Sequence, residues 1–233
     1  MANQNPPLDN LEIIKDSVAK KRNCHAFPVS AITEKLAGEK LVDIHKIRNH
    51  VVGFSDDGKC LKDLDLFAEI LKTGVLVMTH CEPETEYIKL YLEILEKTGG
   101  KLHIQHVSLK ESVKLIEDFK WKNGCNFQNK KIRLTAETCP HYFTFTKDEL
   151  ETKVNPPLAN KEDVRAIRKA LQEEIIDVIA SDYAPTPRIT GIAGFRSFLP
   201  LCYGLVLSSV LNEQQLKKLL FINHMAIINN SGN

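Results

Sequence analysis

The chain has 233 residues, with 31 Lys and Arg against 30 Asp and Glu, and 43% of its residues are hydrophobic. This near-neutral balance gives no overall field that would favour nucleic acid or an anionic membrane. No apolar stretch approaches the roughly 20 residues that span a bilayer, and residues 1–7 lack the apolar core of a signal peptide. The 6 cysteines are scattered without a C-x-x-C pair, which fits a reducing, cytoplasmic compartment.

The chain opens with a predicted helix over residues 9–22, which Asp9 or Asn10 can cap. A first strand is expected over 26–29, where Pro28 weakens the prediction because proline lacks an amide hydrogen. Further strands are expected near 51–54, 75–79, 102–106, 132–137 and 176–181. Helices are expected near 61–73, 85–98, 109–120, 161–173 and 213–220.

Alternating strands and helices are typical of a parallel sheet. We therefore predict an α/β fold, a TIM-type (β/α)8 barrel, as a single domain over residues 1–233. The chain supplies only about six of the eight β-α units that close such a barrel. Open sheet edges are normally covered, so a homodimer or a hetero-oligomer is expected.

Polar residues able to bind metal or move protons follow the predicted strands. They are Asp57, His80, His106 and Asp182. The carboxyl ends of the strands in a parallel barrel meet at one rim, so we expect these four side chains to share one site. Imidazole and carboxylate groups are ligands that suit zinc.

Other polar residues near the strand ends have simpler interpretations. His103 is expected to be a packed core histidine, and Asp56 a loop or capping carboxylate. Cys81 and Cys139 are expected to be buried thiols, because no nucleophile-base spacing singles them out. For His141 the sequence leaves a structural role and a role in the site equally open.

Seven motifs carry a resemblance to one enzyme family. They are MANQNP at 1–6, FSDDGK at 54–59, THCE at 79–82, LHIQHVS at 102–108, TAETCPH at 135–141, VNPPL at 154–158 and IDVIASDYAP at 176–185. In this order they resemble the segments of class I dihydroorotases, in the amidohydrolase superfamily. Each motif alone is weak, but seven in family order are a strong signal.

The resemblance implies a barrel of the metal-dependent hydrolase kind, a small-molecule substrate and a metal. The reaction would be the reversible ring closure of N-carbamoyl-L-aspartate to dihydroorotate in pyrimidine biosynthesis, at a site with one or two Zn²⁺ ions. Asp57 matches the family's metal-bridging aspartate, and His80 and His106 match two ligands of one metal. Asp182 matches the aspartate that touches the other metal and acts as general base and acid.

Two asparagines match residues that contact the substrate in the family. Asn155 lies in the VNPPL motif, and Asn3, in the first motif, matches the asparagine that faces the substrate carboxylate. Both are therefore candidate substrate-binding residues.

The chain also departs from the family pattern. The H-x-H-x-R of the first barrel strand is absent, and Ala159, Thr186 and Arg196 stand where the family has arginine, histidine and glutamate. The loops after Glu82 and after Pro187 are short. We expect that the sequence joins segments of a longer protein or represents a truncated form.

These departures leave two other functions open. One is a catalytically inactive, dihydroorotase-like scaffold for a partner such as aspartate transcarbamoylase. The other is a related cyclic amidase, an allantoinase or a hydantoinase. Those enzymes typically use a carboxylated lysine as the bridging ligand, so Asp57 argues for a dihydroorotase.

Overall fold

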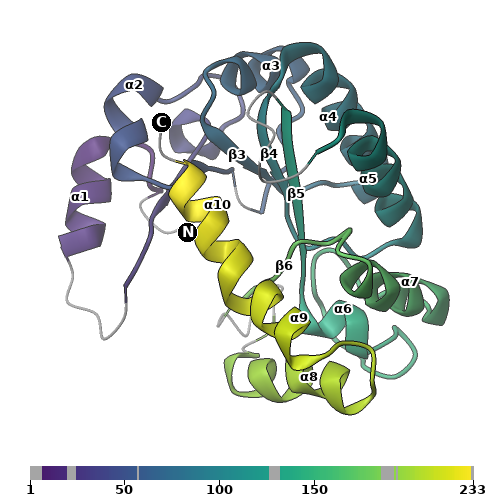
Figure 1. The fold of residues 1–233 in the computed structure, drawn as a ribbon. Coiled ribbons are helices and arrows are strands. Elements are labelled where there is room, and N and C mark those ends of the chain that lie inside the picture. The colour runs from purple at the N-terminus through teal and green to yellow at the C-terminus, as the bar shows by residue number, and fades with distance from the viewer. Residues whose placement is uncertain are drawn as a thin grey trace.

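The computed structural model describes residues 7–19, 25–56, 58–125, 132–184, 192 and 194–231. Within these ranges six strands form one parallel sheet in chain order (Figure 1). They are β1 (Val29–Ser30), β2 (Gly53–Phe54), β3 (Leu76–Thr79), β4 (Gly100–Ile104), β5 (Ile132–Thr138) and β6 (Val178–Ile179). The sheet curls as part of a barrel, which confirms the predicted fold class and all six strands.

The first strand lies later than predicted. Its ladder begins at Val29, which pairs with Gly53, while the Pro28 carbonyl accepts a hydrogen bond from the Val52 amide at 2.9 Å. Proline can accept but not donate in a ladder, so regular pairing starts only after it.

Four helices cover the outer face of the sheet: α3 (Leu64–Lys72), α4 (Glu84–Thr98), α5 (Lys110–Asn123) and α7 (Lys161–Gln172) (Figure 1). Each was predicted from its apolar periodicity. Asp63 caps α3, and Asn160 forms a capping box with Asp163 at the start of α7. None of the helices in the described ranges is long and apolar enough to cross a membrane.

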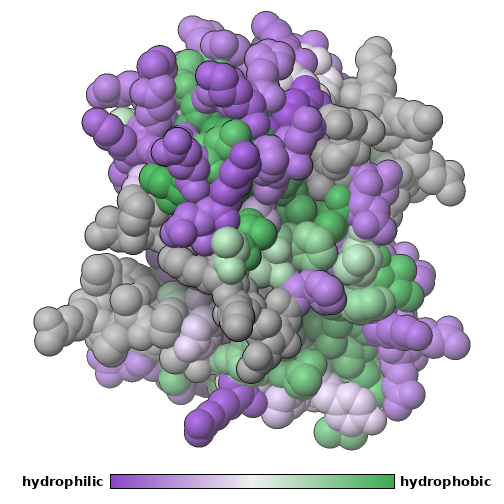
Figure 2. Space-filling view, turned by 90° about the vertical axis from the view of Figure 1, so that its left-hand side faces the viewer, coloured by the Kyte–Doolittle hydropathy of each residue, from purple (hydrophilic) through white to green (hydrophobic). Residues whose placement is uncertain are grey.

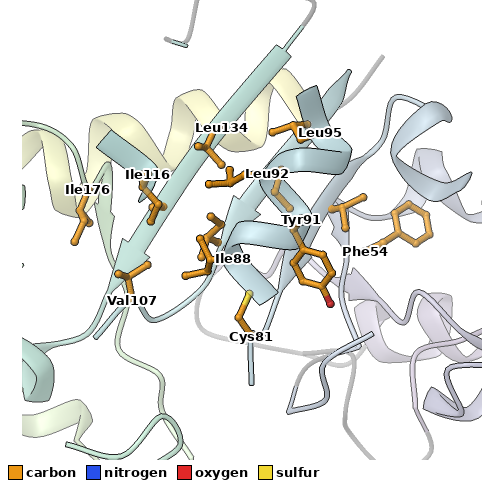
Figure 3. Packing of buried hydrophobic residues seen from close by; sticks show 14 of the residues in the cluster. Phe54, Cys81, Ile88, Tyr91, Leu92, Leu95, Val107, Ile116, Leu134 and Ile176 are labelled. Carbon is orange, nitrogen blue, oxygen red and sulfur yellow. The ribbon is translucent and has the colours of Figure 1, made fainter. Parts of the chain in front are cut away.

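The core lies between this outer face and the helices. Side chains from α4, such as Ile88 and Tyr91, pack against strand residues such as Leu134, and all three are fully or almost fully buried (Figure 3). Adjacent strand residues point to opposite faces of a sheet, so this core takes every second residue of each strand. The residues between them face the barrel interior.

The remaining helices are shorter or were not predicted in full. They are α1 (Leu11–Ala19), α2 (Ile44–Ile47), α6 (Pro140–Thr144), α8 (Phe195–Leu207), α9 (Glu213–Lys217) and α10 (Asn223–Ser231), with helical turns η1 (Glu34–Leu36), η2 (Arg48–His50) and η3 (Lys218–Ile222). Asn10 caps α1 by accepting a hydrogen bond from the Ile13 amide at 3.1 Å. The apolar character of α8 on all sides, with Pro200 inside it, hid its helical period.

Helix α10 lies across the inner face of the sheet (Figure 1). Asn223 Nδ2 donates to the Asp177 carbonyl at 2.7 Å, and His224 Nε2 lies 3.0 Å from the Ile179 carbonyl oxygen. Ile227 packs against Leu76 and Val178. In a closed barrel, inward-pointing side chains of all the strands pack against one another. Here α10 covers the apolar side chains on the inner face of the sheet.

Buried carboxylates fasten the loops at the carboxyl ends of the strands. Asp56 Oδ1, after β2, accepts hydrogen bonds from the Ile32 and Thr33 amides at 2.8 and 3.0 Å. Glu84 Oε1, after β3, accepts hydrogen bonds from the Ser108 and Leu109 amides at 3.0 and 3.1 Å. The predicted role of Asp56 as a loop carboxylate is confirmed, and each carboxylate ties one β-α unit to its neighbour.

Two more carboxylates continue this pattern. Asp163 Oδ1 accepts a hydrogen bond from the Lys110 amide at 3.0 Å, which ties α7 to the start of α5. Asp177 Oδ2 accepts from the Ala136 amide at 2.8 Å and from Lys120 Nζ at 2.6 Å. Backbone amides that would otherwise be buried without partners are thus satisfied.

The Asp56 contacts give a stability prediction. Asp56→Ala should lower the free energy of unfolding by about 3 kcal/mol, because buried amide donors lose their acceptor. Urea unfolding followed by circular dichroism measures the change. Glu39→Ala, at an exposed position, is the control and should change the free energy of unfolding by less than about 0.5 kcal/mol. Equal effects of the two substitutions would contradict the role of Asp56.

Candidate functional site

Two buried histidines meet at the carboxyl ends of adjacent strands. His80 directly follows β3, His106 lies two residues after β4, and each is 4% exposed. His80 Nδ1 lies 2.8 Å from His106 Nε2. The predicted convergence of these two residues is therefore present in the structure. His106 has a φ of +39°, an uncommon conformation for a non-glycine residue, which is often found at functional sites.

Asn155 and Glu82 orient His80 from its other side. Asn155 Nδ2 lies 3.2 Å from His80 Nε2 and donates to Glu82 Oε2 at 3.0 Å. His80 Nε2 also lies 3.6 Å from Glu82 Oε2, so the amide of Asn155 and the carboxylate of Glu82 both face this ring nitrogen. The other ring nitrogen, Nδ1, is the one that faces His106.

The site keeps His106 neutral. Burial, and next the charge of His80, lower the pKa of His106 to about 3. Its Nδ1 is buried without a hydrogen-bond partner in the described part of the chain. A neutral imidazole is the form that binds a metal. The hydrogen bond from Asn155 lowers the pKa of Glu82, so this carboxylate is ionised at neutral pH.

A second group of polar side chains gathers where β5 and β6 end. Cys139 follows β5, His141 lies in the first turn of α6, and Asp182 follows β6 with a φ of +44°. One ligand atom of each lies within 4.8 Å of the others. Burial raises the pKa of the Cys139 thiol well above its usual value and lowers that of His141 to about 4.

The structure thus divides the predicted residues between two places on one rim. His80, His106 and Asn155 are in contact, whereas Asp182 lies with Cys139 and His141. The other two candidates, Asp57 and Asn3, lie outside the described residues.

A buried polar contact between His103 and Glu137, behind the rim, was missed from the sequence. His103 Nε2 lies 3.0 Å from Glu137 Oε2, and His103 Nδ1 lies 2.8 Å from Thr135 Oγ1. Burial opposes ionisation of Glu137, but the hydrogen bond from His103 prevails and its pKa is lowered. His103 is buried as expected, yet its contacts are polar. The register of β4 and β5, which places His103 opposite Thr135, is the signal that identifies this cluster.

The arrangement suits chemistry at a metal ion. It combines neutral imidazoles with an ionised carboxylate and a primary amide on a partly buried rim, a set that can bind a divalent cation and orient a polar substrate.

Comparisons with known proteins agree with this chemistry. The chain is 29% identical to a dihydroorotase of Aquifex aeolicus over 98% of its length, and 31% identical to one of Trichlorobacter lovleyi over 93%. It is 34% identical to a dihydroorotase of Caldicellulosiruptor saccharolyticus over 79%. The chain covers 64%, 61% and 50% of these relatives, respectively. No protein-family model matches it.

The relatives also carry residues that this chain lacks. The alignment with the Aquifex protein extends over 276 positions although the chain has 233 residues, so the relative has additional residues inside the aligned region.

Solved structures show the same fold. The L-hydantoinase of Arthrobacter aurescens superposes with a TM-score of 0.83, at 17% identity, over 98% of this chain and 62% of the other. The Saccharomyces cerevisiae dihydroorotase bound to 5-fluoroorotic acid superposes with a TM-score of 0.81, at 16% identity, over 98% and 75%.

The low pKa of His106 predicts how stability depends on pH in the metal-free protein. The unfolded chain, with a histidine pKa near 6.5, binds a proton that folded His106 does not accept until about pH 3. Stability should therefore fall as the pH drops below about 6.5. Between pH 7 and pH 5 His106 alone should account for a loss of about 2 kcal/mol.

Urea unfolding at pH 7 and pH 5 measures this loss. In His106→Gln the decrease in unfolding free energy over this interval should be smaller than in the wild type by about 2 kcal/mol. In His25→Gln, a substitution at an exposed histidine, the wild-type decrease should persist. The same pH dependence in wild type and His106→Gln would contradict the buried neutral state of His106.

Proposed function

Because the chain is dihydroorotase-like in sequence and shares its fold with cyclic amide hydrolases, we propose that it catalyses the reversible ring closure of N-carbamoyl-L-aspartate to dihydroorotate. The chain covers less than two thirds of its curated relatives, so activity, substrate and partners are proposals for the whole protein. The observation that carries the proposal is the contact of His80 with His106 at adjacent strand ends.

The two imidazoles fit a metal ion. Ligand nitrogens of one tetrahedral zinc, with bonds of ~2.1 Å, lie roughly 3.4 Å apart, so His80 and His106 need to separate only slightly from their contact. His106 Nδ1, the ring nitrogen on the far side from this contact, is buried without a hydrogen-bond partner in the described residues. His80 and His106, with Asp57 and Asp182, are the proposed ligands of one or two Zn²⁺ ions. A bound zinc ion would polarise the amide carbonyl and lower the pKa of a coordinated water.

The other residues would bind the substrate and move protons. In the hydrolytic direction, an oxygen of the Asp182 carboxylate would take a proton from the attacking water and return it to the departing amide nitrogen. Ring closure would run these transfers in reverse. Asn155 Nδ2 would keep its contact with His80 and exchange its hydrogen bond to Glu82 for one to the substrate, and Asn3 would face the substrate carboxylate.

The histidine pair gives the first test of function. His80→Ala/His106→Ala should lose at least one zinc per chain and lower the rate of dihydroorotate formation at least about a hundredfold, since even outer-shell changes cost 10–100-fold. Metal content after zinc loading and the absorbance of dihydroorotate measure the two effects. His45→Ala/His50→Ala, at two exposed histidines, should leave both values unchanged. Wild-type zinc content in the first variant would exclude these ligands.

Asn155 gives a second test. Asn155→Ala removes the donor that orients His80, so zinc affinity should fall about 10–100-fold while the fold is retained. A competitive chelator titration measures the affinity, and Gln214→Ala on the surface of α9 is the control. Unchanged affinity in Asn155→Ala would show that His80 is held by other contacts.

One feature favours the scaffold as a second candidate. Phe195, Leu199, Tyr203 and Leu207 recur every four residues on α8 and are 71%, 63%, 46% and 76% exposed. Apolar side chains gather in the lower half of the surface, the level at which α8 lies in Figure 1 (Figure 2). An exposed stripe of this kind is typical of a protein-protein contact.

The substrate and the partner are tested together. Purified protein is assayed with N-carbamoyl-L-aspartate and, separately, with a hydantoin that lacks the carboxylate, and its mass in solution is measured alone and with aspartate transcarbamoylase. Turnover of the first substrate supports the dihydroorotase, and turnover of the hydantoin alone supports the related cyclic amidase. A stable complex without turnover supports the scaffold.

A further inference from the structure

A thiol, an imidazole and a carboxylate lie together on the rim beside the histidine pair. We propose that Cys139, His141 and Asp182 form a binding site for one thiophilic divalent cation of the zinc type, separate from the ion held by His80 and His106. The inference rests on the proposed function for the role of Asp182. It extends that function because it adds Cys139 and His141, which the sequence did not assign, as two further ligands of the metal ion that Asp182 binds.

The three side chains lie close enough together to bind one metal ion. One ligand atom of each lies within 4.8 Å of the other two. Ligands of a tetrahedral zinc with bonds of about 2.0–2.3 Å are ~3.5 Å apart, so small side-chain movements would bring all three onto one ion. The cluster therefore already approximates the geometry of a metal site.

His141 supplies a second, independent observation. It is 4% exposed, and its Nε2 is buried without a hydrogen-bond partner in the described ranges. Buried polar atoms nearly always have a partner, so an unpaired nitrogen points to a missing ligand or ion. Packing alone would explain a buried thiol, but not an unpaired imidazole nitrogen in a ring that contributes to the same cluster.

The backbone fixes the cluster from both strands. Thr138 pairs with Ile179, and the Ala180 amide donates to the Thr138 carbonyl at 2.9 Å. These bonds set the distance between Cys139, which follows β5, and Asp182, which follows β6. His141 stands two residues after Cys139, in the first turn of α6. The ligands are thus held by paired strands and a helix start.

The donor set indicates the kind of cation. A thiolate selects zinc-type ions over Mg²⁺ and Ca²⁺, which prefer oxygen. Three protein ligands leave the fourth tetrahedral position open, as in catalytic rather than structural zinc sites. On binding, the Cys139 thiol would release its proton to solvent as the sulfur–metal bond forms. A cavity of about 160 Å³ adjoins the cluster at His141 and Ser181.

Cobalt(II) titration tests the site, because a thiolate ligand adds a near-ultraviolet charge-transfer band that imidazole and carboxylate ligands do not produce. We expect the band in the wild type at one Co²⁺ per chain. It should persist in His80→Ala/His106→Ala and disappear in Cys139→Ser, a nearly isosteric change. In His141→Gln the Co²⁺ affinity should fall about tenfold or more.

Cys81→Ser is the matched control, since Cys81 is also buried but contacts Thr79 and lies outside the cluster. It should keep the band, and circular dichroism of every variant checks that the fold is intact. A wild type without the band, or a folded Cys139→Ser protein that retains it, would overturn the proposal. So would loss of the band in the His80→Ala/His106→Ala protein.

Failure of this site and failure of the proposed function give different results. If the charge-transfer band appears but no dihydroorotate forms, the cation site is supported and the proposed activity is rejected. If dihydroorotate forms but the band is absent, the activity is supported and the cation site is rejected.

Discussion

The rim depends on buried carboxylates that accept hydrogen bonds from backbone amides of neighbouring β-α units. Asp56, Glu84 and Asp163 each make such contacts, from the loop after β1 to the start of α7. One carboxyl group can accept from more than one amide, but removing it from water is costly. The hydrogen bonds of these carboxylates therefore fix the positions of the loops, and the loop positions determine the orientation of His80 and His106.

Burial has a different role at the histidines themselves. It keeps His106 and His141 neutral, so their nitrogens remain available to a cation at physiological pH. The same burial leaves a nitrogen on each ring without a partner among the described residues. Buried nitrogens without partners lower the stability of the metal-free protein. A bound metal raises the stability again, because a ligand that binds only the folded state stabilises it.

The sequence was sufficient for the sheet and for part of the site. Short apolar runs ending at polar residues located five of the six strands, and the convergence rule for parallel strands brought His80 to His106. It was insufficient for Cys139 and His141, whose approach to Asp182 depends on how the chain turns from β5 into α6. Helix α8 lacks an amphipathic period, and α10 is defined by the inner face that it covers. The positions of Asp57 and Asn3 lie outside the described residues.

The position of α10 has a consequence for synthesis on the ribosome. Residues 223–231 emerge after all six strands, yet they cover the inner face of the sheet and contact the backbone at Asp177 and Ile179, shortly before Asp182. Nascent chains fold from their N-terminal side. Until α10 has left the exit tunnel, apolar strand residues such as Leu76 and Val178 stay open to water or to chaperones. Ribosome pausing late in the message would therefore prolong an aggregation-prone state.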